Sequence, residues 1–302
     1  MTQELYRFAD DTGALRSMRA GLYPVLGLLL LIAGCAGNQQ GQSTPQSEGR
    51  SATVPAAGVM SDADVSREAN RLRRALLVEV PEHTIGNADG AAAWIARTKA
   101  VADTAQTVID RAQLLVVVDR DPAVQELRII LARPDAPWQV IGGSKVSTGQ
   151  AGRHGYFITP TGVFLHTDGI LDYRALGTFN ENHIRGLGIR GMRVWDFGWQ
   201  AAQRGWGADR DTVEIRLEMH ATDPDYLVQR LGRPASEGCV RVPATMNRFL
   251  DVHGVLDADY ERAARDDRRF QAILRSDREP TPLAGNAMVV VDSSQDGHVT
   301  LP

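Results

Sequence analysis

Cysteine is scarce in this chain, with two residues, Cys35 and Cys239, among 302. Long apolar runs are scarce too, because the stretch Leu22–Ile32 is interrupted by Pro24 and is shorter than the roughly 20 apolar residues that a membrane-spanning helix needs. Basic charge is not in excess either, since the formal net charge is −4. These shortages exclude a framework of internal disulfides and argue against a nucleic-acid-binding protein, which favours a basic face.

The N-terminal region has the order of an export signal. Residues 18–37, "MRAGLYPVLGLLLLIAGCAG", begin with a charge at Arg19, continue through an apolar core and end in small residues before Cys35. The last part, "IAGC", resembles a bacterial lipobox, in which the cysteine is lipidated and becomes the mature N-terminus. Because residues 1–17 are polar, we expect translation to start at Met18. The alternative is an ordinary buried segment with a chance cysteine.

The lipobox resemblance implies a cellular location. It implies a signal peptide over 1–34, a lipid on Cys35, and a protein anchored on the periplasmic face of the cell envelope. Ala36, rather than aspartate, follows the lipidated position, and this resembles the sorting rule for the outer membrane. In that oxidising compartment Cys239 is the one thiol left, and it has no cysteine with which to form an internal disulfide. Structural thiols there usually pair, so Cys239 requires another explanation.

Composition and hydrophobic periodicity divide the rest of the chain. A segment rich in Gln, Ser, Gly and Pro predicts a flexible linker, and helical spacing of apolar residues follows it. Ser61 and Asp62 are candidate caps of a first helix that runs through Val78, and a second helical stretch covers Gly90–Ala112. The predicted segments are a linker over 35–60, a helical segment over 61–112, a catalytic domain over 113–293 with a helical insertion near 257–275, and a tail over 294–302.

Short β-strands dominate the predicted catalytic domain. Apolar or alternating runs begin near residues 114, 126, 138, 155 and 211, and "NAMVVVD" near Asn286 is a candidate last strand. Helices come first and a meander of strands follows. We therefore expect an α+β fold with a mainly β catalytic domain, a mixed sheet or sandwich, preceded by the helical segment.

Cys239 and His220 form a candidate catalytic pair. His220 ends the strand-like run "TVEIRLEMH", and Cys239 follows 19 positions later in "RPASEGCVRVP". A cysteine nucleophile needs a base within hydrogen-bonding reach. Gly238 permits a turn that aims backbone amides at one point. Pro243 suits the start of a helix whose positive end would lower the thiol pKa. By spacing alone, a buried cysteine acting as a small hydrophobe is the commoner case.

Three motifs, in order, resemble the L,D-transpeptidase (YkuD) catalytic domain. His220 is followed after 15 residues by "SEGCVR", whereas that family shows Ser/Thr-His-Gly-Cys, an apolar residue, and Arg or Asn. "VSTGQAG" at 146–152 and "TPTGVF" at 159–164 are similar to earlier segments of the family. The resemblance covers roughly 114–251. Two positions depart from it, because Ala221 replaces a glycine and Glu237 replaces a histidine.

The resemblance implies the chemistry of peptidoglycan L,D-transpeptidases. Cys239 would attack a stem tetrapeptide and release D-alanine, with His220 as the base. The resulting thioester would pass to an amine, giving a 3→3 cross-link or an attached protein. Ser236 would orient the histidine or the turn, Gly238 would help to bind the oxyanion, and Arg241 would hold the loop or a substrate carboxylate. The family needs no metal or organic cofactor.

Other features leave alternatives open. Trp195, Phe197 and Trp199 are candidates for a substrate groove, although aromatic residues more often pack in cores. Glu237 is a further substrate-binding candidate, and its charge would disfavour a thiolate. The alternatives to transfer are an L,D-carboxypeptidase or hydrolase that uses the same thioester, and a non-catalytic peptidoglycan-binding lipoprotein. The expected partners are stem peptides and the outer membrane, and the sequence does not indicate an oligomeric state.

Overall fold

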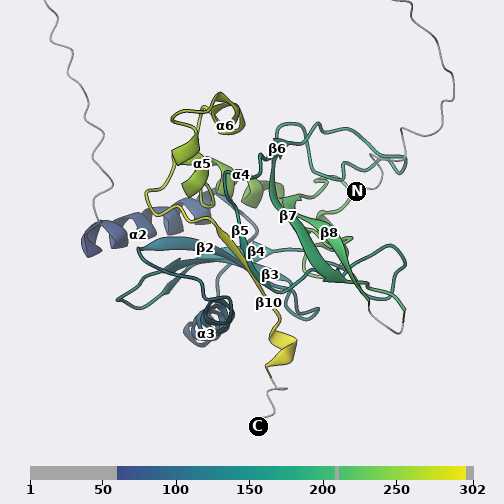
Figure 1. Cartoon of the computed structure of the whole chain (residues 1–302), viewed down its shortest axis with the longest axis horizontal. Coiled ribbons are helices and arrows are strands. Elements are labelled where there is room, and N and C mark those ends of the chain that lie inside the picture. Colours follow the sequence, from purple (N-terminus) through teal and green to yellow (C-terminus); the bar gives the residue numbers. More distant parts are fainter. Residues whose placement is uncertain (1–59, 208–210, 297–302) are drawn as a thin grey trace, which may run out of the picture. The chain divides into compact units, whose positions relative to one another are not determined.

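Two β-sheets form the centre of the fold in a computed structural model that describes residues 60–207 and 211–296 (Figure 1). Sheet A has the strand order β1-β4-β3-β2-β10-β5, and sheet B has the order β6-β7-β8-β9. Their bounds are His83–Thr84 (β1), Gln113–Asp119 (β2), Glu126–Ala132 (β3), Gln139–Lys145 (β4), Gly162–Leu165 (β5), Tyr173–Arg174 (β6), Arg193–Gln203 (β7), Thr212–Ala221 (β8), Val240–Val242 (β9) and Ala287–Val291 (β10). The predicted α+β, mainly β class is confirmed.

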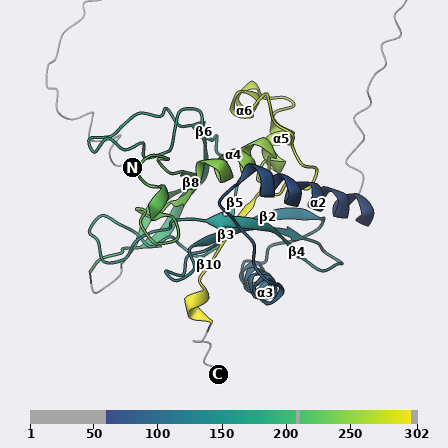
Figure 2. The same ribbon diagram turned by 180° about the vertical axis from the view of Figure 1, so that it is seen from behind.

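Sheet A is buried on both faces. All residues of β2 are buried, and its side chains alternate between two separate apolar clusters. Leu114 and Val116 face the cluster that includes helix α2 (Asp62–Glu79), whereas Leu115 faces the cluster that includes Trp94 of helix α3 (Ala88–Thr104). Figures 1 and 2 show the two helices on opposite faces of this sheet. A strand covered on both sides can be apolar throughout, which explains the run "LLVVV".

Sheet B shares its core with sheet A. Trp195, Leu217, Met219 and Val240 belong to the same cluster as α2 and one face of β2. Helix α4 (Ala244–Val252) adds buried residues to this cluster directly after β9. The predicted helical segment 61–112 therefore folds with the sheets rather than apart from them.

The two N-terminal helices differ in how well the sequence predicts them. The first begins as expected, because the Ser61 side chain accepts a hydrogen bond from the Asp64 amide. The second ends at Thr104, so the prediction that it continues to residue 112 is wrong. Gln106 has a φ of 53°, and the Thr107 amide donates to the Ala102 carbonyl. This is a Schellman arrangement with glutamine in the left-handed position where glycine is usual.

The predicted helical insertion consists of two short helices instead of one. They are α5 (Ala258–Ala263) and α6 (Arg268–Ile273), and the Asp267 side chain caps the second of them. Tyr260 and Phe270 form a small core of their own beneath the charged residues. Two single turns of 3₁₀ helix, η1 (Val228–Arg230) and η2 (Ser293–Gln295), complete the described elements.

A buried ion network ties sheet B to these helices. The Arg193 guanidinium, 0% exposed, lies 2.7 Å from Asp172 and 3.2 Å from Asp257, and it also faces Asp251. The Nδ1–H of His166 donates to the Leu256 carbonyl (2.9 Å), and its Nε2 lies 2.9 Å from the Asp172 carboxylate. Breaking one partner of such a network leaves an uncompensated buried charge, which costs several kcal/mol.

Some predicted features lie outside the described residues. They are the signal peptide over 1–34, lipidated Cys35, the linker up to residue 59, and residues 297–302 of the tail. Within the described ranges, no helix is both long enough and apolar enough to cross a membrane.

The packing of α2 generates a stability prediction. Leu72 is 1% exposed, whereas Leu77, on the same helix, is 42% exposed. Leu72→Ala removes buried methyl groups and leaves a cavity, so we expect it to lower the free energy of unfolding by about 2–5 kcal/mol. Leu77→Ala should change it by about 0.5 kcal/mol or less. Urea unfolding of the two variants measures the difference, and equal small effects would show that α2 is a dispensable appendage.

Candidate active site

Strand register places the candidate catalytic pair on one face of sheet B. Strands β8 and β9 run parallel, with Met219 opposite Val240 and His220 opposite Arg241. Met219 and Val240 point into the core, so His220 and Arg241 point to the other face, which we call the site face. One residue before β9, the same alternation puts Cys239 on the site face beside Glu218.

A bulge in β7 brings an exposed tryptophan to the same face. Asp196 pairs with Glu218, and Trp199 pairs with Arg216. Between these two pairs β7 therefore has one residue more than β8. Gly198 has a φ of 78° within this step. The extra residue changes the side-chain parity of the strand. Trp199 therefore shares the site face with Asp196, and 58% of it is exposed.

His220 is held in one tautomer. Its Nδ1–H donates to the carbonyl oxygen of Ala221 over 2.8 Å, so in the neutral ring Nε2 is the nitrogen with a free lone pair. Burial, together with the nearby charge of Arg241, lowers the pKa of His220 to about 3. The imidazole is therefore neutral and able to accept a proton throughout the physiological range. Because Ala221 contributes only its carbonyl, the departure from glycine at this position removes nothing from the site.

Cys239 is partly exposed and sits at the edge of the face. Its Sγ lies 3.7 Å from the Arg216 carbonyl oxygen, to which the thiol donates. In the described part of the chain, no hydrogen bond joins the thiol to His220. The two residues are diagonal neighbours on adjacent strands, because His220 pairs with Arg241 and Cys239 lies two residues before Arg241.

The thiol rests in its neutral form. Burial raises the pKa of Cys239 to about 12, and the charge of Glu218 adds to this effect. The prediction that the following helix lowers the thiol pKa is wrong. Pro243 caps α4 at the far end of β9, roughly 10 Å of strand away from the sulfur, and a helix dipole acts only within about one turn.

A tight turn carries the thiol. The Ser236 hydroxyl donates to the Cys239 carbonyl over 2.6 Å and accepts from the Gly238 amide over 3.2 Å. Gly238 has a φ of 132°, and a Cβ there would lie 2.8 Å from the Ile215 side chain. The Gly238 amide is thus engaged within the turn. The Cys239 amide, for which the described residues provide no acceptor, is the candidate donor to an oxyanion.

The three motif segments meet at this turn. The Thr159 hydroxyl donates to the Gly238 carbonyl (2.6 Å) and accepts from the Gly149 amide (2.8 Å). Ser147 pairs with Arg241 through two backbone hydrogen bonds of 2.9 Å. Segments that are up to 90 residues apart in the sequence, from residue 147 to residue 236, therefore fix the position of the nucleophile together.

Arg241 is anchored in the turn and retains a spare donor. One of its terminal nitrogens donates to the Ala235 carbonyl over 3.2 Å, whereas its buried Nε has no partner among the described atoms. Its charge lowers the pKa of His220. The contact with Ala235 agrees with the predicted role of Arg241 in holding the loop. Its role in binding a substrate carboxylate stays a prediction, because the spare Nε is buried.

The structure corrects part of the predicted substrate groove. Trp195 and Phe197, 0% and 3% exposed, pack in the shared core and cannot contact a substrate. Only Trp199 of the three aromatic residues lies on the site face. The Glu237 side chain is exposed, and its carbonyl accepts from the Phe157 amide (3.4 Å). The charge of Glu218, a carboxylate that the sequence analysis does not name, contributes to the raised pKa of the Cys239 thiol.

Sequence reasoning missed Glu218 and its neighbours. The Tyr173 hydroxyl donates to Glu218 Oε1 over 2.8 Å, and burial raises the pKa of Glu218 above its usual range. Beside it, Asp196 accepts three hydrogen bonds of 2.7–2.9 Å from Arg216. Glu218 lies two positions before His220, so strand alternation was the available signal for it.

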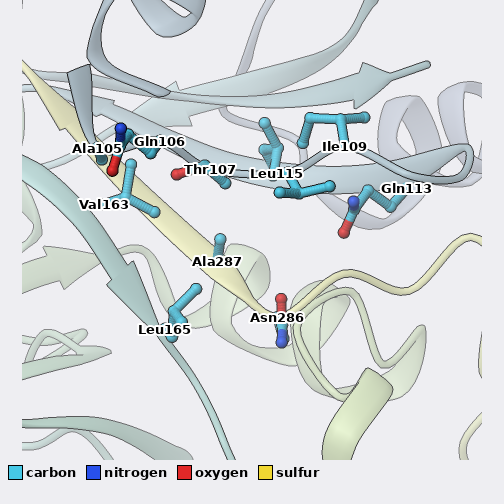
Figure 3. Close-up of a pocket in the computed structure, with 11 residues that line it drawn as sticks. Ala105, Gln106, Thr107, Ile109, Gln113, Leu115, Val163, Leu165, Asn286 and Ala287 are labelled. Atoms are coloured by element: carbon cyan, nitrogen blue, oxygen red, sulfur yellow. The ribbon is translucent and has the colours of Figure 1, made fainter. Parts of the chain in front are cut away.

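Other candidate sites lie elsewhere in the fold. No group of three or more His, Cys, Asp or Glu side chains in the described ranges could hold a metal ion. A cavity of about 370 Å³ lies between the end of α3 and strands β2, β5 and β10 (Figure 3). Its lining includes Leu115, Val163 and Ala287 from sheet A and no residue of sheet B.

The neutral thiol generates a pH prediction. Iodoacetamide reacts with the thiolate, so alkylation of Cys239 should accelerate about tenfold per pH unit from pH 7 to pH 10, whereas an ordinary thiol levels off above about pH 9. Glu218→Gln removes the nearby negative charge, which lowers the thiol pKa and should speed alkylation at pH 8 by roughly three- to tenfold. Glu214→Gln, an exposed control on the same strand, should have no effect. Peptide mass spectrometry of the Cys239 peptide measures the rates; a plateau by pH 9 would contradict the assignment.

Comparisons with known proteins assign no family. No family model matches the chain, and no curated protein matches it. Among solved structures, it is similar to a fused Zn-dependent amidase/peptidase/peptidoglycan-binding domain-containing protein from Clostridium acetobutylicum, with 11% sequence identity and a TM-score of 0.25. The match covers 66% of this chain and 62% of that one, so the chain spans less than two thirds of that protein's length. A likeness at this TM-score carries no argument, and the site is interpreted from its own residues.

Proposed function

We propose that the protein is a cysteine-dependent acyltransferase of the L,D-transpeptidase type that acts on peptidoglycan stem peptides. The observation that carries the proposal is the tautomer of His220, whose Nδ1–H is bound to the Ala221 carbonyl. This leaves Nε2 as a proton acceptor on the face that also carries the partly exposed Cys239 thiol. The motif resemblance, and the meeting of its three segments around Cys239, support the substrate class.

Acylation begins from a neutral pair. Because the pKa of Cys239 is about 12 and that of His220 is about 3, the thiol keeps its proton until the substrate arrives. Sγ attacks the carbonyl carbon of the amide that precedes the terminal D-alanine, and the thiol proton moves to Nε2 as the S–C bond forms. The carbonyl oxygen becomes an oxyanion that the Cys239 amide binds. A preorganised donor of this kind contributes about 3 kcal/mol to the barrier reduction.

Collapse of the tetrahedral intermediate completes the first half. The C–N bond breaks, Nε2 returns its proton to the leaving amine, and D-alanine departs, which leaves a thioester on Cys239. In the second half an amine of another stem peptide attacks the thioester carbonyl and loses a proton to Nε2, and the sulfur leaves with that proton. Water in place of the amine gives hydrolysis by the same steps.

The proposed location follows from the N-terminal signal. A lipid on Cys35 would hold the catalytic domain on the periplasmic side of the outer membrane, where stem peptides are found. Residues 35–59 would then form the tether between the lipid and helix α2.

The product decides between transfer and trimming. Wild-type protein incubated with a disaccharide tetrapeptide should give a cross-linked dimer that has lost D-alanine, detected by mass spectrometry. A lone tripeptide would identify a hydrolase. Cys239→Ala should abolish both products, because it removes the nucleophile, and His220→Ala should slow their formation by about 10²–10⁴-fold through loss of the base.

A matched histidine control separates catalysis from folding. His83→Gln alters a histidine on β1, an edge strand of sheet A, whose ring hydrogen-bonds the Val80 carbonyl, and it should leave the rate unchanged. Thermal unfolding of each variant checks that the fold is intact. Product from Cys239→Ala at the wild-type rate, or no product from the wild type, would refute the proposal.

A further inference from the structure

We propose that Glu218 is a specificity-determining residue, which selects peptides that place a primary ammonium group next to the carbonyl attacked by Cys239. This inference rests on the proposed function and deepens it by naming a substrate group and the residue that binds it. The one-residue extension of the β8–β9 register makes Glu218 and Cys239 cross-strand neighbours on the site face. Side chains in such pairs are roughly 5 Å apart at Cβ, so a peptide that reaches the thiol also reaches Glu218.

The charges around Glu218 are unbalanced. Its neighbour Asp196 is fully engaged by Arg216 through three hydrogen bonds. Within the described ranges, Glu218 itself forms no ion pair, and its carboxylate receives one hydrogen bond, from the neutral Tyr173 hydroxyl. His220, on the same strand, is neutral as well. The charge of Arg216 acts on Glu218 without forming an ion pair with it. Glu218, 6% exposed, therefore lacks the directly paired cation that a buried carboxylate normally requires.

The geometry favours an ammonium group over other cations. Tyr173 occupies Oε1, which leaves Oε2 for one further donor. An arginine fork needs both oxygens of a carboxylate, whereas a single N–H of an ammonium group needs one. A metal ion needs more ligands than the described acidic and histidine side chains assemble here. The open rim is aromatic, since Tyr173 is 37% and Trp199 is 58% exposed, and aromatic faces also attract cations.

Occupation of this position would also affect the nucleophile. The negative charge of Glu218 opposes ionisation of the neighbouring thiol. A bound ammonium group offsets that charge when the scissile carbonyl reaches Sγ. The correct substrate would thus assist proton transfer from Cys239 to His220, and a peptide with a neutral side chain would not.

Binding in an inactive background tests the inference. The probes are two stem tetrapeptides that are identical except for lysine or Nε-acetyl-lysine at the third position, titrated calorimetrically into Cys239→Ala protein. We expect the lysine peptide to bind roughly tenfold tighter or better, because a charge-assisted hydrogen bond is at stake. Adding Glu218→Gln should reduce the ratio to about twofold or less, while the hydrogen bond with Tyr173 and the fold are retained.

Two further variants sharpen the comparison. Glu214→Gln removes the same charge from an exposed position on the same strand and should keep the full ratio. Glu218→Asp retains the charge on a shorter side chain and should keep part of it. A full ratio in Glu218→Gln, or equal binding of the two peptides to the Cys239→Ala protein, or no binding of either, overturns the inference. Because Cys239→Ala cannot turn over, absence of product in the wild type refutes the proposed function alone.

Discussion

The parallel pairing of β8 with β9 is the constraint on which the site depends. Strand β9 has three residues, yet its register with β8 decides which side chains face the core and which lie on the site face. A shift by one residue would turn Cys239 and Arg241 inward and bring Val240 to the surface. The register is held from both sides, by the core contacts of Val240 and Val242 and by the backbone bonds between Ser147 and Arg241.

Local electrostatics keep both the Cys239 thiol and the His220 imidazole uncharged in the absence of a ligand. Burial and a neighbouring carboxylate disfavour the thiolate, while burial and Arg241 disfavour the imidazolium. Both effects oppose a preformed ion pair, and α4 is too far from the sulfur to offset them. In the proposed reaction, activation is therefore coupled to substrate arrival. The neutral thiol is also less open to oxidation, since the thiolate is the form that oxidants attack.

The sequence predicts the frame of the fold better than its details. Runs such as "LLVVV", the cap at Ser61 and the α+β order follow from local patterns, and they agree with the structure. The end of α3 does not follow from local patterns. Gln106 adopts a left-handed backbone conformation there, which a glutamine in the sequence does not predict. The edge strands β1, β6 and β9 have only two or three residues each, too few to show the alternation of apolar and polar residues that predicts a strand.

The sequence predicts those residues of the candidate site that belong to a recognisable motif, and it misses the others. The sequence motifs name His220, Ser236, Gly238, Cys239 and Arg241. In the structure, Ser236, Gly238 and Cys239 share one turn, and Arg241 follows it on β9, opposite His220 of β8. Glu218 was missed, because its role arises from a register between two strands that lie far apart in sequence. The buried network around Arg193 was missed for the same reason, since its three carboxylate partners lie 21 to 64 residues away from it in the sequence.

The bulge at Gly198 divides β7 into two halves in which odd-numbered side chains point to opposite faces of the sheet. Before it, odd-numbered residues such as Trp195 fill the interior; after it, odd-numbered Trp199 meets solvent. The number of residues in the strand, and not their chemistry, decides whether each aromatic ring lies in the core or on the exposed site face. One inserted or deleted residue at the bulge could therefore move an aromatic ring from the core to the exposed face, or the reverse, without changing any other side chain.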